Sequence, residues 1–129
     1  MPPRPLALAA LLLAALGACA APRAPAEGGA VAAVVRMTDA FEFDPAAVTI
    51  RAGETVEWRN ASRFRHSVTA DPALGGAALP PGAQAFASGE LAPGASFRRT
   101  LTVPGTYRYF CSQHEGVGMT GEITVLPVK

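Results

Sequence analysis

Apolar and polar residues alternate along most of the chain after residue 34, with the period of two that β-strands show. Val56 and Trp58, for example, fall on one face of a strand, while Glu57 and Arg59 fall on the other. Turn sequences with Gly or Pro separate such segments, and no segment has a convincing helical period. The pattern predicts an all-β sandwich of about seven to eight short strands.

Three of the inward-facing rows include residues with metal-binding chemistry. His66 begins one row and Cys111 ends another, while Met119 begins the last row, near the C-terminus. The pattern therefore places all three at strand ends on the interior side of the sandwich. The residues that we expect in the core are Phe41, Phe43, Val56, Trp58, Phe97, Leu101, Tyr107 and Ile123.

Two segments fit the strand pattern less well. In segment 97–103, Arg99 falls on the apolar face, which predicts either a bulge or an edge strand. Segment 71–95 consists mostly of Ala, Gly and Pro, and structureless loops of this length are uncommon in compact domains. We expect Phe86 and Leu91 to pack inward and a short edge strand to interrupt the segment; a mobile loop is the alternative.

The N-terminus has the features of an export signal. Arg4 precedes an apolar run, Leu6–Ala18, which is shorter than the roughly 20 residues that a transmembrane helix needs. The run ends in Leu-Gly-Ala-Cys, which resembles a bacterial lipobox with Cys19 as the lipidated residue. Cleavage at Ala18-Cys19-Ala20 by ordinary signal peptidase is the alternative and gives a soluble periplasmic protein.

The chain is therefore divided into three parts. We expect a signal peptide over residues 1–18, a flexible Pro/Gly-rich tether over 19–33 and one folded domain over 34–129. The protein would be exported to the periplasm or cell envelope, either free or anchored through a lipid on Cys19.

Charge gives little information about partners. The chain has 11 basic and 10 acidic side chains, and no run of like charge indicates nucleic-acid binding. Arg59, Arg63 and Arg65 precede His66 closely. They form either a solvated turn or a docking patch for an acidic partner.

Four side chains have the chemistry of a copper site. His66, Cys111, His114 and Met119 offer two imidazoles, a thiolate and a thioether, and the chain has only these two histidines. This is the ligand set of a blue-copper electron-transfer centre. Zinc sites use Cys, His and carboxylates rather than methionine. Copper would also occupy Cys111, which is otherwise a lone thiol in an exported protein.

The spacing of these residues resembles the copper loop of the plastocyanin/pseudoazurin branch of the cupredoxins. That branch spaces its ligands as Cys-x2-His-x4-Met, as Cys111, His114 and Met119 are spaced here. Its first histidine follows an Asn by six residues, as His66 follows Asn60. The resemblance covers residues 34–127 and implies a Greek-key β-sandwich that binds one type 1 copper ion through the four ligands above.

The resemblance also implies roles for residues around the copper. Asn60 would form a hydrogen bond near Cys111 or Ser112 and so make the site rigid. The imidazole edge of His114 would reach the surface through an apolar patch formed in part by residues 116–118. Gln113 stands where the family often has Pro, and Arg65 where plastocyanins have Pro, which argues against a photosynthetic partner.

The function expected from these observations is single-electron transfer between periplasmic redox partners that dock transiently near His114. Copper storage or delivery is the alternative, although such proteins tend to have sites richer in Met and His. An enzyme is not expected, because further copper centres need more histidines than this chain has. We expect a monomer that contacts a membrane only through an N-terminal lipid.

Overall fold

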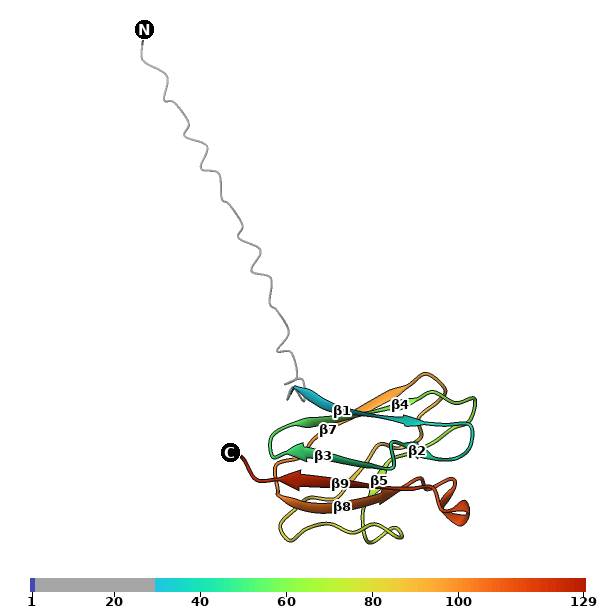
Figure 1. The fold of residues 1–129 in the computed structure, drawn as a ribbon. Coiled ribbons are helices and arrows are strands. Elements are labelled where there is room, and N and C mark those ends of the chain that lie inside the picture. The colour runs from blue at the N-terminus through green and yellow to red at the C-terminus, as the bar shows by residue number, and fades with distance from the viewer. Residues whose placement is uncertain (2–29) are drawn as a thin grey trace.

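The computed structural model describes residue 1 and residues 30–129, and the folded part of this range consists of two packed β-sheets (Figure 1). The lipidation site Cys19, most of the predicted tether and all of the predicted signal peptide except Met1 lie outside the described residues. The first strand begins at Val31, three residues before the start predicted for the folded domain. In the described range, no helix combines the length and apolar character needed to span a membrane.

The first sheet has the strand order β2-β1-β4-β7, and the second has the order β3-β9-β8-β5-β6. Strands β1 and β4 run parallel, as do β3 and β9, and the other pairs are antiparallel. The first sheet contains β1 (Val31–Met37), β2 (Phe43–Asp44), β4 (Thr55–Asn60) and β7 (Ser96–Thr100). The second contains β3 (Ala47–Arg51), β5 (Thr69–Ala70), β6 (Phe86–Ala87), β8 (Gly105–Phe110) and β9 (Thr120–Leu126).

The all-β sandwich predicted from the alternation is confirmed. The described residues contain nine strands, slightly more than predicted, because β2, β5 and β6 have only two residues each and leave no period to detect. A 3-10 turn, Glu115–Val117, lies in the loop between β8 and β9, seen at the right of Figure 1.

The core lies between the two sheets and centres on Trp58. Its ring lies 5.4 Å from that of Tyr109 in the opposite sheet and 5.8 Å from that of Phe97. Phe41 and Phe97 are partly buried and pack against the core, and the other predicted core residues are buried. Aromatic rings from both sheets thus supply much of the apolar area that stabilises the fold.

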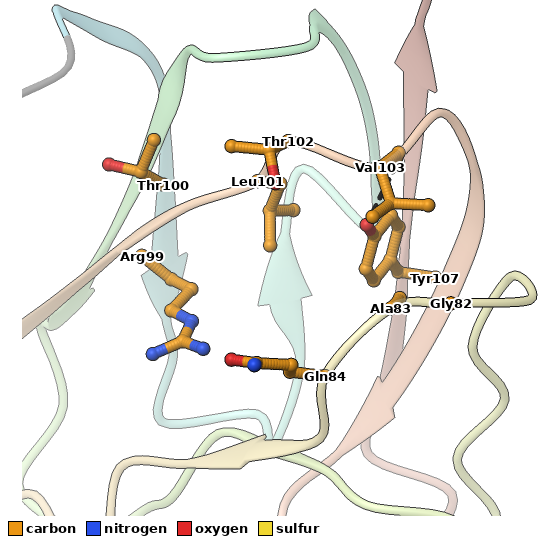
Figure 2. A pocket seen from close by; sticks show the side chains of 9 residues that line it. All are labelled: Gly82, Ala83, Gln84, Arg99, Thr100, Leu101, Thr102, Val103 and Tyr107. Carbon is orange, nitrogen blue, oxygen red and sulfur yellow. Dashed lines mark hydrogen bonds between the residues drawn. The ribbon is translucent and has the colours of Figure 1, made fainter.

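Arg99 lies on the inward face of an edge strand, as one of the two sequence-based alternatives predicted. Its guanidinium carbon lies 5.2 Å from the centre of the Phe86 ring, so the charge rests over an aromatic face at the rim of the sandwich. Beside it is an open cleft of about 440 Å³, in which the Arg99 and Gln84 side chains face each other (Figure 2). Tyr107, at the end of β8 away from Cys111, also lines this cleft and donates a 2.7 Å hydrogen bond to the Val103 carbonyl (Figure 2).

The segment from 71 to 95 is ordered by contacts with the metal-binding end of the sandwich. Strand β6 pairs with β5, and both Phe86 and Leu91 are buried, which confirms the expected short edge strand. Leu91 forms an isolated bridge with His66, with backbone hydrogen bonds of 3.1 and 2.7 Å in the two directions. The segment therefore helps to fix the position of a predicted ligand.

Glu57 is buried although the alternation places it on the outer, polar face of β4. Its carboxylate accepts hydrogen bonds from Arg59, on the same strand, and from Arg98 on β7, at 2.5 Å in the second case. The two guanidinium groups cover the carboxylate. The hydrogen bond from Arg59, followed by that from Arg98, holds the pKa of Glu57 below its usual value in spite of burial.

Glu57→Gln should lower the free energy of unfolding at pH 7 by about 1 to 3 kcal/mol, because a charged acceptor of two hydrogen bonds is lost. Since the folded state lowers the pKa of Glu57, this stabilisation is present above the unfolded value of 4.5 and is lost as pH falls through the folded value. Urea unfolding at pH 7 and at pH 3 measures both effects.

Glu122→Gln provides the matched control. Glu122 pairs with Arg108 at 3.2 Å on the exposed face of the second sheet, so its loss should cost under about 1 kcal/mol. Equal destabilisation by the two substitutions would contradict the role given to Glu57.

Candidate metal centre

Cys111, His66 and His114 bring their donor atoms together at one end of the sandwich. Cys111 follows the last residue of β8, His66 lies in the bridge before β5, and His114 lies in the loop between β8 and β9. Their ligand atoms all lie within 4.8 Å of one another. Cys111 and His66 are fully buried, whereas His114 is partly exposed.

The distances between these atoms fit a single bound metal ion. Cys111 Sγ lies 3.7 Å from His66 Nδ1 and 3.4 Å from His114 Nδ1. An ion with a sulfur bond of about 2.3 Å and nitrogen bonds of about 2.0 Å, at angles of about 110 to 120°, needs sulfur–nitrogen separations of about 3.5 to 3.7 Å. The three side chains thus fit a first-row metal ion of this size with little rearrangement.

The ligand loop is closed by backbone hydrogen bonds. Cys111 N donates to the Met119 carbonyl at 3.0 Å, and His114 N donates to the Cys111 carbonyl at 3.1 Å. These bonds continue the β8–β9 pairing, in which Phe110 lies opposite Thr120. Met119 is buried and adjacent to Cys111 across this hairpin, and its role as the weak axial ligand stays a prediction.

A serine beside His66 connects the two halves of the site. Ser67 N donates to Cys111 Sγ at 3.3 Å, and Ser112 N donates to Ser67 Oγ at 2.8 Å. The two serine hydroxyls are also 2.8 Å apart. Ser67 was not predicted from the sequence, and the only signal for it is that it follows a ligand directly and so must lie beside the sulfur.

The bond predicted from Asn60 to Cys111 or Ser112 is wrong. Both amide hydrogens of Asn60 are donated to carbonyls, to that of Phe64 at 2.7 Å and that of Leu91 at 2.9 Å. Asn60 ends β4 and therefore reaches the turn that leads to His66 rather than the sulfur. Because Leu91 pairs with His66, Asn60 still supports the first histidine, but from the side away from the copper loop.

His114 is partly exposed, and an apolar side chain packs against its ring. The Phe41 ring lies 4.5 Å from the His114 ring and 5.0 Å from that of Phe64. Phe64 is 39% exposed and Val117, in the predicted apolar patch, is 68% exposed. Phe41 was expected in the core, but it lies at its margin with a φ of 59°, a conformation that bulky residues rarely adopt.

A second contact holds the ligand loop from the other side. The Glu115 carboxylate accepts a 3.1 Å hydrogen bond from Gly76 N. A Cβ atom on Gly75 would lie 2.7 Å from the Phe110 ring and 2.8 Å from the Glu115 carboxylate, so the two segments meet where only glycine fits. The Gly75–Gly76 pair thus packs against Glu115 and helps to hold the start of the 3-10 turn in place.

The arginines near His66 are each paired with an acidic side chain. Arg59 pairs with Glu57, while Arg63 pairs with Asp39 and Arg65 with Glu90, at 3.3 Å in both of the latter cases. The Arg63 and Arg65 pairs are exposed at both ends, whereas Arg59 is used to cover the buried Glu57. This pairing favours the interpretation of the segment as a solvated turn over that of a docking patch.

Burial makes His66 a poor proton acceptor. Desolvation, followed by the neighbouring charge of His114, lowers the pKa of His66 below its usual value of 6.5. A neutral imidazole is the form that binds a metal ion, so the folded protein keeps this ligand ready at mildly acidic pH.

The copper-free protein should therefore lose stability as pH falls below about 6.5, because the unfolded chain binds a proton at His66 that the folded chain resists. Above that pH this contribution is constant. Urea unfolding of the copper-free protein between pH 5 and 8 measures the slope, and His66→Gln, which cannot titrate, should reduce it. An identical slope in the variant would show that His66 is not responsible.

The comparisons with known proteins agree with this site. Residues 30–126 match the family described as copper binding proteins, plastocyanin/azurin family. The chain belongs to this family, and its cluster of His66, Cys111 and His114 fits one type 1 copper ion.

A plastocyanin from Scenedesmus fuscus is 43% identical over 90 residues, which cover 67% of this chain and 88% of that protein. The chain spans 51% to 66% of the length of the longer chloroplastic plastocyanins that it also matches. Among solved structures, the copper-containing nitrite reductase NirK from Thermus scotoductus SA-01 has a TM-score of 0.62 and 29% identity, over 78% of this chain and 23% of that chain. A purple cupredoxin from Nitrosopumilus maritimus, at 22% identity and a TM-score of 0.58 over 73% of this chain and 99% of that chain, shows the same fold.

Proposed function

We propose that this protein carries single electrons between redox partner proteins through one type 1 copper ion, held by His66, Cys111 and His114 with Met119 as a weak fourth ligand. The observation that carries the proposal is the position of Cys111 Sγ, 3.7 and 3.4 Å from the Nδ1 atoms of the two imidazoles. Copper bound by this set of ligands supplies a Cu(I)/Cu(II) couple whose two states both tolerate one geometry.

The protein contributes a fixed and dry environment for that couple. The hydrogen bonds of Ser67 to Cys111 and Ser112 hold the sulfur against the segment of the first histidine. The complete burial of His66 and Cys111 excludes water from the donor atoms of these two residues. Little movement is then needed when the charge of the metal changes, which favours rapid transfer.

His114 provides the route between the metal and the surface. It is the one imidazole of the pair that is partly exposed, and Phe41, Phe64 and Val117 form an apolar rim beside it. A small apolar rim suits the brief, low-area contacts of redox encounters. We therefore propose that donor and acceptor proteins both dock over His114, with the chain acting as a monomer.

The similarity to a nitrite reductase does not favour an enzyme. The match covers 23% of that protein, and both histidines of this chain are already used in one site. A second copper centre built on imidazoles would need ligands that this chain does not have. The same observation weighs against copper storage or delivery, which the spectroscopic test below distinguishes.

We also propose that the protein is exported and anchored through a lipid on Cys19. Support comes from the sequence alone, in the apolar run of residues 6–18 followed by Cys19. Mass spectrometry of the mature protein, produced in a bacterium, measures whether Cys19 is the first residue and bears diacylglycerol. A mature protein that begins at Ala20 or later without lipid would exclude the anchor.

The function is tested by visible spectroscopy and voltammetry of the copper-loaded protein. An intense thiolate-to-Cu(II) absorption with a reversible one-electron couple is expected, and Cys111→Ser should abolish the absorption while the far-UV spectrum of the fold is retained. A protein that binds copper without that absorption or couple would favour storage or delivery. A strongly blue Cys111→Ser variant would exclude Cys111 as a ligand.

Met119→Leu should keep copper bound but raise the reduction potential, because loss of the thioether favours Cu(I). A shift on the order of 60 mV corresponds to a tenfold change in the Cu(I)/Cu(II) ratio for one electron. Met37→Leu makes the same change in a buried methionine of β1 and should leave the potential unchanged. An unchanged or lowered potential in Met119→Leu would argue against Met119 as the axial ligand.

A further inference from the structure

Gln113 lies between two of the metal ligands in the sequence, and its side chain contacts the sulfur of one of them. The Cys111 thiol donates a hydrogen bond to Gln113 Oε1 at 3.4 Å, and the Ser112 hydroxyl donates to the same oxygen at 3.3 Å. An amide oxygen suits a protonated thiol because it accepts hydrogen bonds. It does not suit a thiolate, which also only accepts them.

Copper binds the thiolate, and the thiol proton is released to water when the metal enters. Rotation of the Gln113 amide about its last torsion exchanges the oxygen for an NH2 group with two donor hydrogens. The two orientations have nearly the same shape, and Gln113 is exposed, so packing does not oppose the rotation. We infer that in the copper-loaded protein the Gln113 amide nitrogen donates a hydrogen bond to the Cys111 thiolate and thereby raises the reduction potential.

The neighbouring hydroxyls support the new direction of this bond. The amide NH2 can donate to both Cys111 Sγ and Ser112 Oγ, since both atoms already lie within reach of the present oxygen. Ser112 can then donate to Ser67 Oγ at 2.8 Å, and the Ser67 hydroxyl faces the sulfur at 3.9 Å. Every hydroxyl has a donor and an acceptor, and the chain of bonds ends on the thiolate.

The consequence for the metal follows from the electron density on sulfur. Hydrogen bonds to a ligating sulfur withdraw electron density from it, so the thiolate becomes a weaker donor to copper. This loss destabilises Cu(II) more than Cu(I) and therefore raises the reduction potential. Ser67 N already donates one such bond at 3.3 Å, and Gln113 adds another. A proline at this position offers no side-chain donor. The inference rests on the proposed function, because it concerns the potential of the same site.

Voltammetry of the copper-loaded full chain tests this, with Gln113→Glu and Gln113→Ala beside the unsubstituted protein. Gln113→Glu keeps the shape but replaces the NH2 donor by oxygen, and Gln113→Ala removes the side chain. Both should lower the potential, so that the Cu(I)/Cu(II) ratio at the midpoint of the unsubstituted protein falls several-fold. Gln84→Glu makes the same charge change in the cleft of Figure 2, at the edge of the sandwich near Tyr107, and should leave the midpoint where it is.

Nuclear magnetic resonance of the Cu(I)-loaded protein gives a second measurement. One side-chain amide hydrogen of Gln113 should shift downfield and exchange slowly with water, whereas those of Gln84 should not. The inference would be overturned if Gln113→Ala had the same reduction potential as the unsubstituted protein, or if only Gln113→Glu lowered it. In either case, a blue unsubstituted protein with a reversible couple would still support the proposed function. Lack of a reversible couple in the unsubstituted protein would instead refute the proposed function.

Discussion

Two hydrogen bonds, from Ser67 N to the Cys111 sulfur and from Ser112 N to the Ser67 oxygen, join segments that are 44 and 45 residues apart in the chain. The two imidazoles belong to different segments, so they reach one sulfur only if these segments are held at a fixed distance. The sandwich supplies the coarse alignment through its strand pairing. The two serines set the final separation, on which every distance in the metal site depends.

The burial around this junction is uneven, and the unevenness has a functional meaning. His66 is enclosed by the bridge to Leu91, whereas His114 lies in a short loop, is partly exposed and has the Phe41 ring 4.5 Å from its own. A metal between them is therefore insulated on one side and in electronic contact with the surface on the other. Such an arrangement serves transfer of charge better than exchange of the metal itself.

Much of this could be predicted from the sequence because long strands leave a clear period. The segments 55–60 and 105–110 alternate over six residues each, and Cys111 directly follows the second of them. The spacing of Cys111, His114 and Met119, and of Asn60 and His66, is that of a known family. Strands of two residues, such as β2, have no period to detect. The alternation placed Glu57 on the exposed face, but two arginines cover its carboxylate. The pattern along one strand does not indicate which side chains of a neighbouring strand will pack over it.

The position of Ser67 illustrates the same limit for the site. Sequence spacing indicates which residues lie near each other along one segment, but the partner of the sulfur depended on how two remote segments meet. Asn60 was assigned that role by resemblance, and its amide is instead used within the turn after β4. Phe41 was placed in the core by its apolar character, since a positive φ cannot be read from the identity of a phenylalanine.

The close approach of Gly75 and Gly76 to Glu115 has an implication for engineering. The composition of the stretch around these glycines suggests a loop that tolerates substitution, but its backbone packs against Glu115 at the start of the 3-10 turn in the ligand loop. A graft that lengthens the loop between Cys111 and Met119 would move Glu115 away from these glycines and leave the Gly76 N–H without its acceptor. Loop exchange between relatives would therefore succeed best when this glycine turn is transplanted together with the copper-binding hairpin.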